Sequence, residues 1–196
     1  AAQPPAQTDQ TIYLKDYQAP LFVINDVKLQ IDIFADYTLV SSILDISPQQ
    51  TGQALVLHGV DLELQSLVLN EQLLTAQSYQ VQGEELVINQ VPNERFTLQT
   101  VVKIYPAKNL ALEGLYLSKG MYCTQCEPEG FRKITYYLDR PDVLSLFTTT
   151  ITADKKHYPT LLANGNLMAK GNAGEGRHFA TWQDPFKKPS YLFAMV

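Results

Sequence analysis

The sequence predicts an all-β fold, arranged as one domain of packed or strongly bent antiparallel sheets. Apolar and polar residues alternate with a period of two over 27–33 and again over 96–104, which is the pattern of a strand with one buried face. Turn-forming residues separate the apolar runs, and the 3.6-residue period of a helix is almost absent. No internal repeat and no Gly/Ser-rich linker divides the chain.

The strands follow one another along most of the chain. Segment 37–46 is rich in β-forming residues and should pair with 27–33 through a tight turn at 35–36. The Asn-Gly pair at 164–165 is the strongest hairpin signal, because a type I′ turn needs positive φ at both central residues. A single helical turn is predicted over 141–145, which begins with proline. The shorter candidate strands are 53–58, 62–69, 72–81, 85–90, 133–138, 145–153, 158–163, 167–171, 177–183 and 190–195.

Composition and charge exclude several classes of protein. The chain has 196 residues, of which 45% are hydrophobic and 18% charged, so it can form a folded core. Its formal net charge of −5 argues against a nucleic-acid partner, since such proteins usually present a basic face. No run of 18 apolar residues is present, so no membrane-spanning helix is expected.

The N-terminus and the cysteines bear on the compartment. Residues 1–10 are polar, lack an apolar core and do not begin with Met, so they are not an intact secretory signal. We expect 1–10 to be a flexible lead-in and 11–196 to form the domain. The chain has only two cysteines, too few for a disulfide framework. Free thiols and the lack of a signal favour the cytoplasm, while the missing Met leaves a processed periplasmic chain open.

The Cys123-x-x-Cys126 pair invites a redox or zinc interpretation. A redox site of this type needs a helix N-terminus in a βαβ unit, and here the setting is all-β. Glu127 and Glu129 follow directly, and negative neighbours disfavour a thiolate. A zinc site needs four ligands, and no second ligand pair has the required spacing. The favoured interpretation is therefore two small, partly buried thiols.

The remaining polar residues give no catalytic signature on their own. His58, His157 and His178 are too far apart to form a local metal motif, so each is predicted to be a surface or hydrogen-bonded histidine. Segment 139–142 has two aspartates around an arginine, which is typical of a local ion pair and turn. The sequence lacks Gly-x-Ser-x-Gly, His-Glu-x-x-His and a phosphate-binding glycine loop.

Three longer segments nevertheless resemble a known family. ALEGLY at 111–116, CTQCEPEGFR at 123–132 and ITYYLDRPD at 134–142 are similar to the amino-terminal domain of the bacterial aminopeptidase N family. These are zinc aminopeptidases with a thermolysin-like catalytic domain. The resemblance covers about 12–196 and is weak over 49–92. Its other matching segments are 13–20, 164–166 and 182–196.

The resemblance implies a fold and a context. In the family, the first domain is an all-β, saddle-like or sandwich domain that packs against the catalytic domain. That second domain carries His-Glu-x-x-His with a downstream Glu for zinc, and Gly-x-Met-Glu-Asn, both absent from this sequence. The resemblance thus implies no catalytic residue and no metal ligand here, and zinc bound outside this chain. The implied partners are the chain's own catalytic domain and peptides with a free N-terminus, and the fragment alone should be inactive.

The family also implies two site residues. Its Thr-Gln-Cys-Glu loop reaches the active site, and the glutamate matching Glu127 helps to bind the substrate's α-amino group. The glutamine matching Gln125 lies beside the pocket for the first substrate side chain. Other matching residues should be architectural. Tyr136, Tyr137, Asp139 and Arg140 are expected to fix the loop, and Trp182, Pro185 and Phe186 to pack near the junction with the catalytic domain.

Two other functional classes stay open at this level. The all-β pattern and the eleven tyrosines also suit a stand-alone β-sandwich module that binds a carbohydrate or a protein. A redox switch at Cys123 and Cys126 is the third alternative.

Overall fold

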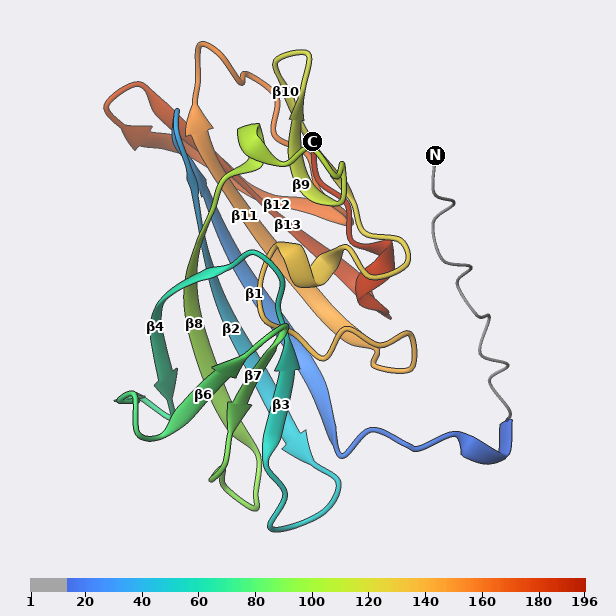
Figure 1. Cartoon of the computed structure of the whole chain (residues 1–196). Coiled ribbons are helices and arrows are strands. Elements are labelled where there is room, and N and C mark those ends of the chain that lie inside the picture. The colour runs from blue at the N-terminus through green and yellow to red at the C-terminus, as the bar shows by residue number, and fades with distance from the viewer. Residues whose placement is uncertain (1–13) are drawn as a thin grey trace, which may run out of the picture.

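The computed structural model describes residues 14–196 and arranges them in three β-sheets (Figure 1). The all-β prediction is confirmed, because helical turns in this part of the chain are short 3₁₀ segments. These are η1 (Leu14–Asp16), η2 (Pro106–Lys108), η3 (Phe131–Lys133) and η4 (Ser190–Leu192). The expected lead-in over 1–10 lies outside the described residues. Within the described range, no helix has the length and apolarity to cross a membrane.

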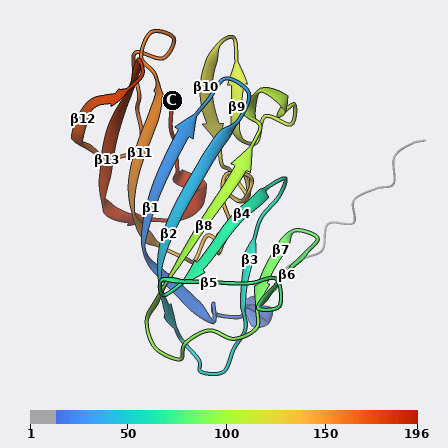
Figure 2. The ribbon, with the colours of Figure 1, turned by 90° about the vertical axis from the view of Figure 1, so that its left-hand side faces the viewer.

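The largest sheet has eight strands in the order β12-β13-β11-β1-β2-β8-β4-β5. Its long strands lie side by side and twist progressively across the molecule (Figure 2). β1 and β11 run parallel, and every other pair in this sheet is antiparallel, so the sheet is mixed rather than purely antiparallel. The strands are β1 (Phe22–Ile33), β2 (Thr38–Pro48), β4 (Glu63–Leu69), β5 (Gln72–Leu73), β8 (Phe96–Ile104), β11 (Ser145–Asp154), β12 (Asn166–Gly174) and β13 (Arg177–Lys188).

Two smaller sheets complete the fold. The three-stranded sheet has the order β3-β7-β6 and lies beside one half of the large sheet (Figure 1). The hairpin of β9 and β10 forms the third sheet. The bounds are β3 (Leu55–His58), β6 (Tyr79–Gln82), β7 (Glu85–Ile88), β9 (Gly114–Ser118) and β10 (Met121–Gln125).

The buried side chains form a single cluster, which joins the large sheet to the segment around η3. Alternation along β1, β2 and β8 places one apolar face of the sheet inward. Phe131 of η3 is fully buried, with its ring centroid 4.9 Å from Tyr137, 5.2 Å from Phe193 and 5.8 Å from Phe147. Edge-to-face aromatic packing of this kind adds to the energy of burial and anchors the segment that follows β10.

The predicted hairpin at 164–165 is wrong. The real hairpin joins β12 to β13 through residues 174–176, which have φ of 78°, 49° and 75°. The Asn164 side chain instead bonds the main chain near the C-terminus, accepting from Ala194 N–H at 2.7 Å. Gly165 packs against the main chain of Gln183, where a Cβ would lie 2.2 Å from the carbonyl oxygen. Glycine is therefore needed here for close approach, and the turn predicted from it does not form.

Four shorter predicted strands are not continuous strands: 72–81, 133–138, 158–163 and 190–195. The first is split into β5 and β6. Segment 133–138 contains part of η3 and one bridge between Tyr137 and His58, and the last two segments share only the Ala163–Met195 bridge. Short apolar runs do not distinguish a strand from a buried loop, which explains these errors. The predicted helical turn at 141–145 is a simple turn that leads into β11.

Candidate functional site

The two predicted site residues lie at the end of β10 and on the loop that joins it to η3. Gln125 ends β10, and Glu127 follows one residue later. Both side chains are exposed, while Cys126 between them is buried. The Gln125 Nε2 donates a hydrogen bond of 3.3 Å to the Glu127 main-chain oxygen. The structure therefore brings these two residues together at the surface, next to a buried anchor.

The loop is closed tightly by its own main chain. Gly130 N–H donates to the Cys126 carbonyl at 2.9 Å, and Lys133 N–H donates to the Gly130 carbonyl at 3.0 Å. A Cβ on Gly130 would lie 2.2 Å from the Gln125 carbonyl oxygen, so a side chain at this position would force the main chain apart. The Glu127–Pro128 bond inside the loop is cis.

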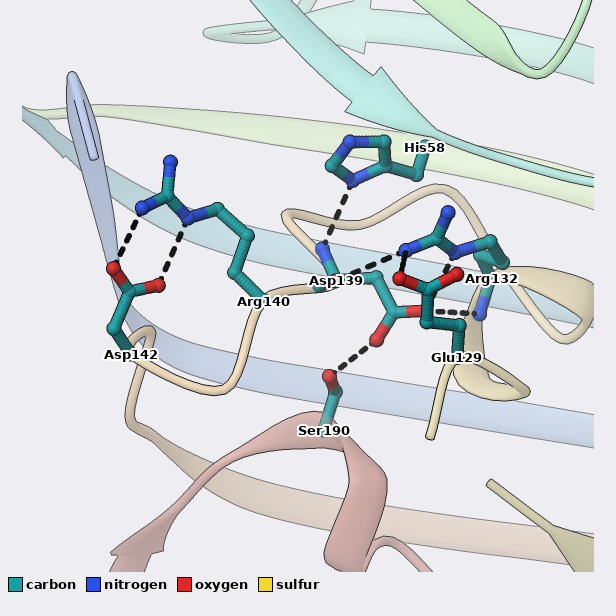
Figure 3. Close-up of polar contacts among 7 residues, drawn as sticks. All are labelled: His58, Glu129, Arg132, Asp139, Arg140, Asp142 and Ser190. Atoms are coloured by element: carbon teal, nitrogen blue, oxygen red, sulfur yellow. Dashed lines mark hydrogen bonds and ion pairs between the residues drawn. The ribbon is translucent and has the colours of Figure 1, made fainter. Parts of the chain in front are cut away.

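A buried ion pair fixes the far side of the loop (Figure 3). Asp139 Oδ2 accepts from the Arg132 Nε at 2.9 Å and from its main-chain N–H at 3.2 Å. Arg132 Nη2 also donates to the Asp139 carbonyl at 3.1 Å, and Ser190 Oγ donates to Asp139 Oδ1 at 2.5 Å. The Asp139 side chain is only 1% exposed, so these contacts replace its hydration.

His58 joins the same group from a distant part of the chain. Its Nδ1 accepts a hydrogen bond of 3.2 Å from the main-chain N–H of Asp139. The main chains of His58 and Tyr137 also exchange hydrogen bonds of 2.8 and 3.1 Å. Sequence analysis missed this role, since no local signal links the end of β3 to residues 137–139. As predicted, His157 and His178 are also hydrogen-bonded, to Asp154 at 2.8 Å and to the Tyr158 carbonyl at 2.7 Å.

Arg140 forms a separate ion pair. Its Nε and Nη2 donate to the two oxygens of Asp142 at 2.8 and 2.6 Å, which confirms a local pair but joins Arg140 to Asp142 rather than to Asp139. The Tyr17 hydroxyl donates to Asp142 at 2.9 Å, so this pair ties the start of the described chain to the segment before β11. The Arg140 guanidinium holds the pKa of Asp142 below its usual value.

A hollow of about 290 Å³ lies beside the loop and is rich in carboxylates. Glu127 and Glu129 line it from the loop, Glu84 from the β6–β7 turn and Glu113 from the segment before β9. The two cations in its wall, Arg132 and Lys133, are already paired with Asp139 or Glu129 and with Glu113. An acidic hollow of this kind suits a cationic group better than an anion. Sequence reasoning missed Glu84, which only the tertiary fold brings here.

The two thiols behave as the sequence predicts. Both cysteines are free, Cys123 partly buried and Cys126 buried. Burial, aided by the charge of Asp139, raises the pKa of Cys126 to about 12. The Cys126 thiol therefore stays protonated near neutral pH, which argues against a redox switch. Among residues 14–196, no group of three or more His, Cys, Asp and Glu side chains could hold a metal ion.

The residues expected to be architectural differ in how deeply they are buried. Tyr136 and Tyr137 are buried, and the Tyr137 hydroxyl lies 2.6 Å from Ser145 Oγ. The Trp182 side chain packs against the core, and its indole N–H donates to the Leu161 carbonyl at 3.0 Å. Phe186 is 76% exposed.

Two curated relatives match nearly the whole of this chain. The chain is 50% identical to aminopeptidase N of Escherichia coli (strain K12) over 191 residues, and 48% identical to that of Caulobacter vibrioides over 192. These matches cover 97% and 96% of this chain but 22% of each relative, so the chain spans about a fifth of their length.

Solved structures of an aminopeptidase and of an M1 zinc metallopeptidase are similar to this chain. The crystal structure of Legionella pneumophila aminopeptidase A in complex with aspartic acid matches with a TM-score of 0.88 at 36% identity, covering 93% of this chain and 22% of that one. An M1 zinc metallopeptidase from Deinococcus radiodurans shares the fold at a TM-score of 0.76 and 15% identity, covering 89% of this chain and 41% of that one. The model of the peptidase M1 N-terminal domain matches residues 23–192, and the chain belongs to this family.

Proposed function

We propose that this chain is the amino-terminal domain of a zinc-dependent aminopeptidase that releases N-terminal residues from peptides. In this proposal, loop 123–132 caps the substrate end of the active site. Glu127 binds the substrate's α-ammonium group, and Gln125 lies beside the first substrate side chain. The relatives named above are aminopeptidases, which supports the class of reaction.

The observation that carries the proposal is an exposed carboxylate on a rigid loop. Glu127 faces solvent between buried Cys126 and buried Gly130, and the Arg132–Asp139 pair holds the end of the loop. A binding group on a fixed scaffold loses little conformational freedom when it takes its ligand. The acidic hollow beside the loop adds to the attraction for a cation.

The chemistry of an exopeptidase explains the carboxylate. Such an enzyme must distinguish a free α-ammonium group from an internal peptide bond. A carboxylate does so through charge-assisted hydrogen bonds, which are stronger than neutral ones. Glu127 would thus give end-recognition, whereas bond cleavage would depend on residues outside this chain.

Zinc would be held elsewhere in the proposed enzyme. The described residues of this chain do not fit a zinc site, because they lack a cluster of three ligands and because the buried Cys126 thiol stays protonated. When bound, zinc in such an enzyme would activate a water molecule for hydrolysis. The chain's own contribution is to bind and orient the substrate.

A substitution in the full-length protein tests the proposal. Glu127→Gln should raise KM for a free-amino dipeptide substrate roughly 30-fold or more, because an unneutralised ammonium group is left in the cleft. Glu94→Gln makes the same charge change at an exposed residue outside the loop and should leave KM unchanged. A KM for Glu127→Gln that equals the wild-type value would contradict the assignment.

A further inference from the structure

The imidazole of His58 connects the three-stranded sheet to Asp139, which pairs with Arg132 at the end of the loop that carries Glu127. Its ring is half-buried at the end of β3, and it lines a hollow of about 430 Å³ together with Phe22, Leu138 and Arg140. Figure 3 shows the ring above the main chain of Asp139, with the hydrogen bond from that N–H directed at Nδ1. Because Nδ1 accepts this bond, it carries no proton, and the ring is neutral.

We propose that His58 is a positioning residue that makes substrate binding by the Glu127 loop depend on pH. The proposal rests on the function assigned above to Glu127. It adds a proton-linked control that this function does not require. The coupling itself concerns only the conformation of the loop, so it can be tested apart from any enzymatic activity.

Protonation of His58 is incompatible with the observed contact. An imidazolium has two N–H donors and no acceptor, so the Asp139 N–H would face a second donor. A half-buried amide that loses its acceptor must move toward water or another partner. The hollow beside the ring gives protons a route to the imidazole.

Movement of Asp139 reaches the loop through Arg132. The backbone N–H of Asp139 bonds His58, while its carbonyl and carboxylate bond Arg132, so one residue makes both contacts. Arg132 is the middle residue of η3, and η3 begins directly after Gly130. The Gly130 main chain closes the loop around Glu127. The path from the ring to the loop therefore consists of hydrogen bonds and three residues of one short helix.

The charges around His58 set the direction of its pKa. Burial lowers the pKa from 6.5, and the positive charge of Arg132 lowers it further. Asp139, Glu85 on β7 and Glu129 on the loop oppose this shift, but they do not reverse it. A second cation, Arg140, lines the same hollow.

The pH response follows from that direction. The folded state holds the neutral ring, and the unfolded chain takes up a proton as the pH falls through 6.5. The native contact is therefore fully present above 6.5 and is lost as the pH falls through the lower folded pKa. We expect tighter substrate binding at neutral pH than below the folded pKa of His58.

Hydrogen–deuterium exchange in the whole protein tests the coupling without an activity assay. His58→Asn keeps an amide oxygen as acceptor and cannot titrate in this range. At pH 7.5 the segment 126–140 should exchange equally in wild type and His58→Asn. Below the pH at which His58 takes up its proton, followed by the NMR shifts of its imidazole, the segment should exchange about two- to tenfold faster in wild type, the value of one hydrogen bond. Equal exchange in the two proteins once His58 is protonated would refute the coupling.

Kinetics then test the link to substrate binding. The ratio of KM in wild type to KM in His58→Asn should rise about two- to tenfold between pH 7.5 and the pH at which His58 is protonated, with kcat changing equally in both. Because both proteins share the substrate and the other titrating groups, the effects of these groups on KM cancel in the ratio. His157→Asn, at an exposed histidine bonded to Asp154, should keep the wild-type profile. A KM ratio that does not change with pH would overturn the proposal. If instead Glu127→Gln leaves KM unchanged while the exchange of segment 126–140 still depends on His58, only the proposed function is overturned.

Discussion

Two aspartates a few residues apart show how burial decides the value of an ion pair. The Asp139 side chain is 1% exposed and bonds Arg132 and Ser190, whereas that of Asp142 is 25% exposed and pairs with Arg140. Removing one partner of a buried pair leaves an uncompensated charge, while a pair near the surface is worth little.

Asp139→Ala should therefore lower the free energy of unfolding by about 3–5 kcal/mol, as measured by urea denaturation. Asp142→Ala is the matched control and should cost about 1 kcal/mol. Equal losses for the two variants would show that the Arg132–Asp139 pair does not anchor the loop.

The thiols give a second test at the level of single residues. With a pKa of about 12, the Cys126 thiol has a thiolate fraction of about one in ten thousand at pH 8. A thiol reagent at pH 8 should modify Cys126 only after unfolding, so the count of fast-reacting thiols should rise when denaturant is added. Rapid modification of both cysteines in the native protein would revive the redox alternative.

Among the structural elements, the loop between β10 and η3 depends on one glycine. Gly130→Ala would place a Cβ 2.2 Å from the Gln125 carbonyl oxygen, and the loop must shift to relieve the clash. Because small misplacements of a binding group are costly, we expect KM of the full-length enzyme to rise roughly tenfold to a hundredfold. Gly120→Ala, in the β9–β10 turn with no atom within 4 Å, should strain only its own φ of 81° and leave KM unchanged.

Prediction from sequence succeeded where local pattern determines structure. The alternation over 27–33 and 96–104 and the turn at 35–36 correctly placed β1, β2 and β8, because a sheet with one buried face imposes a period of two. It failed at 164–165, where the local signal for a turn was overridden by contacts with the C-terminal segment. Such long-range contacts leave no trace in a short window of sequence.

The candidate site was predictable only in part. Resemblance to a family, rather than local chemistry, singled out Gln125 and Glu127. The structure adds Glu84, which lines the hollow beside the loop from the β6–β7 turn. It also adds His58, which meets residues 137–139 through the bridge between β3 and residue 137. No spacing rule links residues so far apart along the chain.

At the scale of the whole molecule, the chain is proposed to supply recognition and not chemistry. The 196-residue chain by itself should release no amino acid from a dipeptide substrate, even with added zinc, because its described residues hold no cluster of metal ligands. The measurement is amino-acid release at high protein concentration, with the full-length protein as the positive control. Zinc-dependent release by the chain alone would contradict the proposed division of roles.

The most direct test of the central claim compares one inhibitor with and without its α-amino group. In the full-length protein, the inhibition constant should favour the amino form by roughly 30-fold or more, and Glu127→Gln should remove most of that preference. Binding of the analogue without the amino group should be the same in both proteins. A preference that survives in Glu127→Gln would show that another group recognises the substrate's amino end.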